Sequence, residues 1–343
     1  MKVLGFAALC AAGLSACSSG GGTLPGGAPA GTSTQSAALS AGPLEMRRLA
    51  TALDLPLLIA PPSRGSRDWL TGDAKTGRNV VYSGDFVNSK VEIYPLKGQN
   101  PAPIGEITTG ISSPERMFVD SKRNLYVTND GHLSCYRPGK TSPWQEIAAG
   151  INRATGVVVG PDGTIYVANA GTNAVTVYPP GQQTPSEALN VGADPQNVAL
   201  DAAGDVYVTY IDGASGSGVV EFPSGSTTPT NLGLNIQDPG GIEIDSSNNV
   251  VVFDSASQDL DIFKPGQTQP SKQIHYADGE PFELAFGKGQ HKLYASIYPG
   301  GSTGFLIETL DYPNGTAPVK QINTAPYQNF ESWPLAVSPD GAV

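Results

Sequence analysis

Three oxygen-bearing side chains occupy matching places in this chain and could together bind a cation. Glu115, Asn197 and Glu283 each follow a proline by one or two residues, and each opens a short, largely apolar run. Carboxylate and amide oxygens are the hard ligands that calcium and magnesium prefer. A carboxylate at such a position can instead be solvated, or it can pair with a cation such as Arg116. The sequence alone leaves these interpretations open.

Signals for other catalytic chemistry are weak. His132, His275 and His291 are far apart, and no His–Glu pair has the spacing of a metal site. The run from Ser215 to Gly218 reads as a flexible loop without the strand–turn–helix context of a nucleophile elbow. Cys135 lies in a strand-like run, which favours a small core residue over a nucleophile. These observations favour a protein that is not an enzyme.

A sequence repeat organises the chain from Asn79 to the C-terminus. Each copy carries an aromatic residue followed by a proline and usually a glycine, and the aromatic residues lie 42, 42, 44, 41 and 49 residues apart. The six anchor residues are Tyr94, Tyr136, Tyr178, Phe222, Phe263 and Tyr312. A fixed period of this length, filled with short strands and turns, is typical of a propeller or a similar array.

Each copy predicts four strands, of which the first is the most apolar and the fourth the most polar. In the third copy, Gly156 to Val159 is a continuous apolar run, whereas the stretch near Ser186 to Val191 is polar. Continuous apolar runs indicate strands covered on both faces, as the inner strands of a propeller blade are. First strands are expected near Met117, Val157, Val198, Ile242, Leu284 and Leu335, and second strands near Tyr82, Tyr126, Tyr166, Tyr207, Val251 and Tyr294.

These two sets of strands are out of phase, because the repeats begin with a second strand and end with a first strand, Pro334 to Ser338. We therefore predict an all-β fold over residues 78–343: a six-bladed β-propeller of four-stranded antiparallel blades. The C-terminal strand is expected to pair with the N-terminal blade and close the ring, which removes the exposed sheet edges of an open array. The alternative is a truncated seventh repeat.

Alternating strand direction places the loops that precede the first strands on one face of the predicted ring. The residues that open the first strands differ between blades, so we expect ligand specificity to reside there. The candidate ligand-binding residues on this face are Glu115, Arg116, Gln196, Asn197, Tyr210, Phe282, Glu283 and Trp333. Nearly uniform turns on the opposite face carry aspartates that we interpret as turn-forming, namely Asp120, Asp162, Asp201, Asp245 and Asp340.

The N-terminus resembles the signal of bacterial lipoproteins. Lys2 precedes an apolar stretch that is too short to span a bilayer and that ends in Leu14-Ser15-Ala16-Cys17. The resemblance implies that residues 1–16 are cleaved and that lipid is attached at Cys17. It also implies an extracytoplasmic location in the cell envelope, at the outer membrane if the organism has two membranes. Residues 17–45 are a low-complexity tether, and residues 46–77 are a lead-in segment with one short helix.

The chain is acidic, with a formal charge of −11 and a pI of about 4.7. This balance argues against binding to nucleic acid and against electrostatic docking on anionic lipid. If Cys17 is acylated, Cys135 has no partner in the mature chain, so no disulfide is expected. We expect a monomer that contacts the membrane only through its N-terminal lipid.

The stretches Pro195 to Asp201 and Pro239 to Asp245, with the strands that follow them, resemble NHL and related six-bladed propeller repeats. The resemblance implies a binding or scaffolding module that holds a protein, peptide or glycan at the variable face and needs no cofactor. Propellers similar to gluconolactonase provide the alternative, a divalent-metal hydrolase of the lactonase type that would use Glu115, Asn197 and Glu283 with calcium or magnesium. Fold alone cannot separate these functions, because propellers host both.

Overall fold

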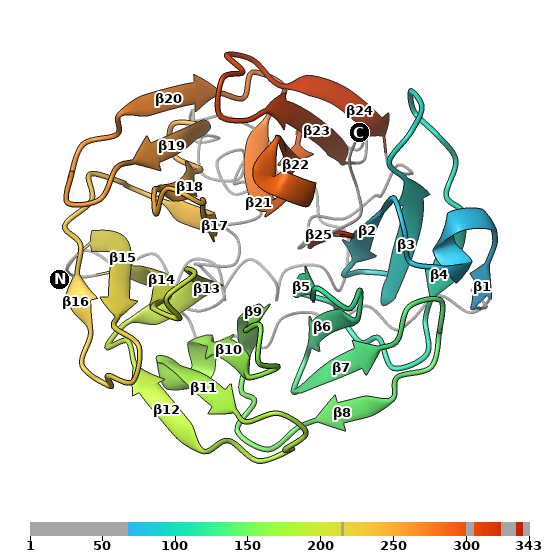
Figure 1. Cartoon of the computed structure of the whole chain (residues 1–343), viewed down its shortest axis with the longest axis horizontal. Helices are drawn as coiled ribbons and strands as arrows, with labels where there is room; N and C mark the ends of the chain where they lie inside the picture. The colour runs from blue at the N-terminus through green and yellow to red at the C-terminus, as the bar shows by residue number, and fades with distance from the viewer. Residues whose placement is uncertain (1–67, 214–215, 300–304, 324–333, 339–343) are drawn as a thin grey trace, which may run out of the picture. The chain divides into compact units, whose positions relative to one another are not determined.

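The computed structural model describes residues 68–213, 216–299, 305–323 and 334–338, which form six β-sheets around a central axis (Figure 1). Every sheet is antiparallel and runs from an inner strand at the axis to an outer strand at the rim. The predicted all-β, six-bladed β-propeller is thus confirmed. The expected signal, tether and short helix lie outside these residues, as do Cys17, Trp333 and Asp340. No helix within the described ranges is long and apolar enough to cross a membrane.

Five blades are each built from four consecutive strands, in agreement with the repeat. Blade 2 comprises β5 (Arg116–Val119), β6 (Leu125–Asn129), β7 (His132–Tyr136) and β8 (Gln145–Ile147). Blade 3 comprises β9 (Ala154–Val159), β10 (Ile165–Asn169), β11 (Ala174–Tyr178) and β12 (Glu187–Asn190), with the 3-10 turn η2 (Ala170–Thr172). Blade 4 comprises β13 (Asp194–Leu200), β14 (Val206–Asp212), β15 (Gly216–Phe222) and β16 (Thr230–Asn231).

The last two of these blades follow the same plan. Blade 5 comprises β17 (Pro239–Ile244), β18 (Val250–Asp254), β19 (Asp259–Phe263) and β20 (Lys272–His275). Blade 6 comprises β21 (Glu280–Phe286), β22 (Lys292–Tyr298), β23 (Leu306–Asp311) and β24 (Val319–Asn323), with the 3-10 turn η3 (Lys288–Gln290). Each expected first strand is therefore an inner strand, and each expected second strand lies beside it.

Blade 1 is assembled from two distant parts of the chain. Its three N-terminal strands are β2 (Val80–Asp85), β3 (Lys90–Pro95) and β4 (Gly105–Ile107), and its inner strand is β25 (Leu335–Val337). β25 pairs with β2 so that Leu335 lies opposite Ser83 and Val337 opposite Val81. Just beyond β25, the backbone N–H of Ser338 donates a hydrogen bond to the Val80 carbonyl (3.1 Å). The predicted closure of the ring by the C-terminal strand is confirmed.

The repeat did not predict the short outer strand β1 (Trp69–Leu70), which makes blade 1 five-stranded. β1 pairs with β4 and leads into the 3-10 turn η1 (Gly72–Lys75). The Asp68 carboxylate accepts hydrogen bonds from the backbone N–H groups of Thr108 (2.6 Å) and Thr109 (3.1 Å). These contacts attach the end of the lead-in to the rim of blade 1 as an ordered strand, where Trp69 is 39% exposed.

The repeated aromatic anchors are core residues, since none of the six is more than 7% exposed. The apolar core is divided into clusters that mostly lie between neighbouring blades rather than inside one blade. One cluster joins blades 2 and 3 around Tyr178, and another joins blades 6 and 1 through Ile307 and Leu335. Full burial of one large apolar side chain contributes roughly 1.5–3 kcal/mol. The contacts between blades therefore stabilise the ring, including the junction that β25 completes.

Strand direction divides the loops between two faces. We call the side with the first-to-second and third-to-fourth strand turns the turn face, and the side where the chain enters the inner strands the mouth face. The turn-forming role predicted for the aspartates is seen in the four that are described. Asp120, for example, accepts hydrogen bonds from the backbone N–H groups of Lys122 (2.9 Å) and Asn124 (2.7 Å). The others close their turns in the same way, namely Asp162, Asp201 and Asp245.

Candidate functional site

The inner strands all run in the same direction, so that equivalent residues of different blades meet at one level near the mouth face. At this level lie Arg116, Gly156, Asn197, Gly241 and Glu283. Hydroxyl groups of the second strands hold the inner backbone in place. The Thr128 hydroxyl accepts a hydrogen bond from the Arg116 N–H (2.8 Å), and the Ser296 hydroxyl accepts one from the Glu283 N–H (3.1 Å).

Two glycines at this level allow neighbouring inner strands to approach closely. A Cβ on Gly241 would lie 2.8 Å from Glu283 Oε1 and 2.9 Å from the Leu284 nitrogen. A Cβ on Gly156 would lie 2.9 Å from both the Cα and the Oδ1 of Asn197. The alternation of glycines with large polar residues lets the side chains of Asn197 and Glu283 fill the space that the glycines leave.

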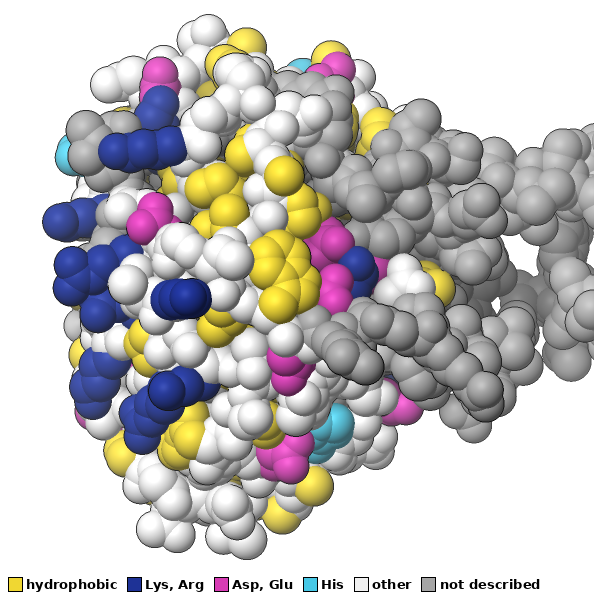
Figure 2. Space-filling view, turned by 90° about the vertical axis from the view of Figure 1, so that its right-hand side faces the viewer, with side chains coloured by type: hydrophobic (Ala, Val, Ile, Leu, Met, Phe, Trp, Pro, Cys, Tyr) yellow, Lys and Arg dark blue, Asp and Glu magenta, His cyan; other side chains and the backbone are white. Residues whose placement is uncertain are grey.

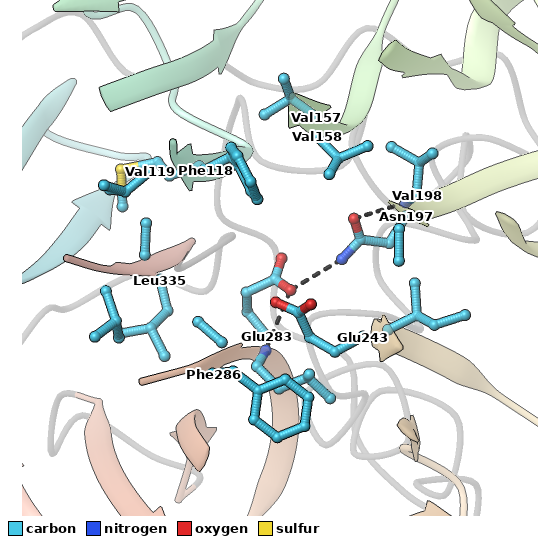
Figure 3. A pocket seen from close by; sticks show the side chains of 17 residues that line it. Phe118, Val119, Val157, Val158, Asn197, Val198, Glu243, Glu283, Phe286 and Leu335 are labelled. Atoms are coloured by element: carbon cyan, nitrogen blue, oxygen red, sulfur yellow. Dashed lines mark hydrogen bonds between the residues drawn. The ribbon is translucent and has the colours of Figure 1, made fainter. Parts of the chain in front are cut away.

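Side chains from three blades form one polar network across the channel mouth. Figure 3 shows two of them, Asn197 of blade 4 and Glu283 of blade 6. Glu283 Oε1 accepts hydrogen bonds from Asn197 Nδ2 (2.9 Å) and from the backbone N–H of Leu284 (3.1 Å). The other carboxylate oxygen of Glu283, Oε2, lies 2.6 Å from Arg116 Nε. Blades 2, 4 and 6 are therefore linked through a single carboxylate.

Arg116 is the cation of this network and is only 1% exposed. Its guanidinium carbon lies 4.1 Å from the ring centroid of Phe282, and its Nη1 donates a hydrogen bond to the Glu115 carbonyl (2.9 Å). A guanidinium over an aromatic face is stabilised electrostatically, most strongly where water is excluded. The arginine is thus buried at the level of the mouth, between the Phe282 ring and the Glu283 carboxylate.

The channel contains a cavity of about 70 Å³ lined by inner strands of all six blades. Its polar side chains are Asn197, Glu243 and Glu283, and the rest of its lining is apolar. Glu243 is two residues further along its strand than Gly241, where the equivalent residues of other blades are apolar, namely Phe118, Val158, Ala199, Ala285 and Ala336. A cavity of this volume holds a few water molecules. It is far smaller than the roughly 300–1,000 Å³ of a small-molecule pocket.

The two channel carboxyls have raised pKa values for related reasons. Burial, reinforced by the negative charge of Glu283, raises the pKa of Glu243 to about 8, and a hydrogen bond from the Phe286 backbone opposes the rise only in part. Burial also raises the pKa of Glu283, although the Arg116 guanidinium and the hydrogen bonds to its carboxylate counteract this effect. Near neutral pH, Glu243 is therefore mainly protonated, whereas the Glu283 carboxyl lies against the Arg116 guanidinium.

The candidate ligand-binding residues fall into groups. Arg116, Asn197, Phe282 and Glu283 converge at the mouth, and Gln196 lies beside them with only 4% exposure. Glu115 is 7% exposed and adjoins Arg116. Tyr210 points elsewhere, since its hydroxyl accepts a hydrogen bond from the amide of Asn231 (2.7 Å) on the outer strand β16. Trp333 lies outside the described residues.

The side chains as they lie do not fit a divalent cation. Arg116 already contacts one oxygen of Glu283, and Asn197 directs its amide nitrogen at the other. The side-chain oxygen of Asn197, Oδ1, accepts a hydrogen bond from the backbone N–H of Val198 (2.8 Å). Within the described ranges, no three His, Cys, Asp or Glu residues form a group that could hold a metal ion. Pairing of a mouth carboxylate with Arg116, one of the interpretations that the sequence left open, is the arrangement present.

Cys135, the only cysteine in the described part of the chain, is buried in β7. Burial, partly opposed by the nearby Arg137 charge, raises the pKa of its thiol to about 12. Nucleophilic cysteines react as thiolates, which this environment disfavours at neutral pH. The thiol therefore acts as a core group.

The geometry defines the class of protein as a six-bladed β-propeller with a polar network closing its channel mouth. No family model and no curated protein matches the chain. Among solved structures, it is similar to a chain of a crystal structure of a nidogen/laminin complex, with a TM-score of 0.60 and 14% identity over 76% of this chain and 98% of that one. It is also similar to a Bacteroides caccae protein of unknown function, with a TM-score of 0.59 and 13% identity over 76% and 98% of the two chains. At these identities the likeness shows the fold alone.

Proposed function

We propose that this chain is a lipid-anchored, extracytoplasmic β-propeller that binds a macromolecular partner at its mouth face. The partner would be a protein, a peptide or a glycan, and the propeller would serve as a binding or scaffolding module. Acylation at Cys17 and NHL-like repeats are parts of this proposal that come from the sequence.

The observation that carries the proposal is the closed channel mouth. A hydrolase acting on a small molecule needs a pocket that takes up its substrate, whereas the cavity that the described residues line in this channel has room for a few water molecules. Its polar groups are already engaged with one another through Glu283. A surface closed in this way offers a broad contact area around the axis, which suits an extended partner better than a small substrate.

The likeness to a propeller in a nidogen/laminin complex supports protein binding as a use of this fold. It does not transfer a partner, because the two chains share only 14% identity. Exposed groups near the mouth face, such as Asp130, Asn152 and Asp278, are available for such contacts.

The experiment compares two triple variants in quantitative crosslinking to intact envelopes of the source organism. The mouth-face variant carries Asp130→Arg, Asn152→Arg and Asp278→Arg. The turn-face variant carries Ser224→Arg, Thr227→Arg and Gln267→Arg. The mouth-face variant is expected to lose the crosslinked partner that the wild type and the turn-face variant retain. Equal crosslinking by both variants would contradict binding at the mouth face.

The lactonase alternative is tested on the same purified protein. Metal content is measured by inductively coupled plasma analysis, and lactone hydrolysis is assayed with and without chelator. Stoichiometric calcium or magnesium, with hydrolysis that chelator abolishes, would replace the binding-module proposal with the enzyme. Mass spectrometry of the mature N-terminus, with Cys17→Ser as control, tests the acylation separately.

A further inference from the structure

All six lysines that are exposed in the described residues lie on the turn face. They are Lys75, Lys97, Lys122, Lys140, Lys264 and Lys288, from η1 and the turns of blades 1, 2, 5 and 6. Blades 5, 6, 1 and 2 are consecutive around the closed ring, so the lysines share one continuous sector, which we call the basic sector. Figure 2 views the rim near blades 1 and 2 and shows Lys and Arg side chains gathered along its left edge.

Blades 3 and 4 contribute no cation to this face, because the sequence contains no Lys or Arg between Arg153 and Lys264. They present Asp162, Asp201 and Asp205 at their turns instead. On the mouth face, Lys90 is engaged by Glu92 (2.7 Å) and Glu106 (3.3 Å). The exposed lysines are therefore segregated to the turn face and, within it, to blades 5, 6, 1 and 2, where exposed Asp73 and Asp311 accompany them.

The six lysines of the basic sector make no ion pair within the described part of the chain. The carboxylate of Asp120, an aspartate in a neighbouring turn, accepts hydrogen bonds from the backbone of its own turn and from Asn124 Nδ2 (2.7 Å). The lysine charges are thus available to an external anion. The small cavity beside Lys140 has no room for a water molecule. The arrangement of the lysines over four blades therefore suits an extended surface better than a compact ligand.

A half-exposed tryptophan accompanies the basic sector. Trp144 is 40% exposed just before β8, and the Arg137 guanidinium carbon lies 4.2 Å from its ring centroid. An indole with one apolar side and one polar edge is favoured at the boundary between lipid and water. Lysine is also a point charge, unlike the arginine fork that recognises individual phosphates. Both features favour a lipid surface over a specific phosphate site.

We propose that the basic sector docks this propeller on a bilayer that contains anionic phospholipid. The net charge of −11 opposes docking in any other orientation, so the charge pattern also orients the ring and turns its mouth face away from the lipid. This surface is separate from the proposed partner-binding face and does not depend on it. A lipid at Cys17 would raise the local concentration of the ring at the bilayer without supplying the orientation.

The test uses the full chain with Cys17→Ser, so that no acyl group contributes, and vesicles of phosphatidylglycerol and phosphatidylcholine in equal parts. Binding by co-sedimentation is expected at low salt, with loss as salt rises and none to phosphatidylcholine alone. A triple variant is expected to lower the partition coefficient between water and vesicles roughly 100-fold. It carries Lys75→Gln, Lys122→Gln and Lys140→Gln. A control with the same charge change at blades 3 and 4, Gln182→Glu, Gln183→Glu and Thr227→Glu, is expected to lower it far less.

Fluorescence gives an independent readout of orientation. Brominated phospholipid is expected to quench Trp144, and Trp144→Phe is expected to remove most of the quenching that vesicles cause. Absence of binding to anionic vesicles at low salt would overturn the proposal, as would equal loss in the two triple variants. Displacement from vesicles by low concentrations of an anionic polysaccharide or of RNA would overturn it in favour of a polymer ligand.

Discussion

Glu243 is a carboxyl group in an otherwise apolar layer of the channel, and its protonation couples the channel to pH. Its pKa is raised to about 8, so between about pH 4.5 and 8 the native state binds more protons than the unfolded chain. The free energy of unfolding therefore falls as pH rises through this window, by up to roughly 1.4 kcal/mol per pH unit. Glu283 acts in the same direction, because its pKa is also raised.

Replacing Glu243 by glutamine tests this coupling. Chemical denaturation of Glu243→Gln is expected to give a shallower decline of stability with pH, and greater stability than the wild type at pH 8. The difference should narrow towards pH 4.5, where the wild-type carboxyl is protonated in both states. Glu187→Gln, on the exposed strand β12, is the control and should reproduce the wild-type pH profile. An unchanged slope in Glu243→Gln would contradict the assignment.

The ion pair between Arg116 and Glu283 makes a second prediction at the residue scale. Arg116→Met is expected to cost about 3–5 kcal/mol of unfolding free energy, because it leaves a buried carboxylate without its cation. Adding Glu283→Gln removes that charge while keeping an acceptor for the Asn197 amide, so the double variant should be more stable than Arg116→Met alone. Additive losses in denaturant titrations would show that the two side chains are not coupled.

The sequence placed Arg116, Asn197 and Glu283 among the candidate binding residues of one face, and these three share one register position of a repeated strand. Its candidate cation site used Glu115 instead of Arg116, which is one residue out of that register. It also raised pairing with Arg116 without deciding it, since rotamers and partners depend on packing between blades. The sequence analysis did not single out Glu243. The usable signal was a carboxylate at a repeat position where the other copies have apolar residues. Tyr210 was included among the candidate residues of the mouth face, yet its side chain reaches outward to Asn231.

At the scale of the elements, close packing of neighbouring inner strands depends on glycine. Gly241→Ala is expected to destabilise the fold by about 1–3 kcal/mol, because the added methyl group would meet Glu283 Oε1 at 2.8 Å and backbone atoms of β21. Gly213→Ala is the control, since a Cβ added there would have no neighbouring atom within 4 Å. Thermal denaturation of both variants checks this, and equal stability would contradict the packing argument.

The strand order could be predicted because the aromatic anchor recurs at a nearly fixed period and fixes the phase of each blade. The strand β1 was not predicted because it lies before the first repeat and its hydrogen-bonded partner is the outer edge of β4. Its position depends on tertiary contacts such as those of Asp68, which no local sequence pattern encodes.

For the whole molecule, stability depends on the junction that β25 makes with β2. Ala336→Asp is expected to cost at least about 3 kcal/mol, because Ala336 is 2% exposed and a carboxylate there has no partner. Val319→Asp, at a position 59% exposed on the outer strand β24, should change stability by less than about 0.5 kcal/mol. Similar losses in denaturant titrations of the two variants would show that the junction does not govern stability.

The distribution of charge over the surface is also a property of the whole molecule, and the amino-acid composition gives only its sum. The net value of −11 argued against an anionic surface as a partner, whereas the arrangement of the lysines supports the proposal of one. Net charge averages over both faces, and only the assembled ring separates them. The gap in Lys and Arg between Arg153 and Lys264 was visible in the sequence, but its meaning required the position of each blade.

The pairing of Val81 with Val337 has a consequence for biosynthesis. A ribosome that has translated blades 2 to 6 has not yet made β25, the strand that finishes blade 1, so the ring closes only after that strand has been translated. Until then, the edge of β2 is exposed to other nascent chains and to chaperones. Because closure comes late, the chain also stays incompletely folded for longer, which is compatible with the export that the proposed N-terminal signal would require.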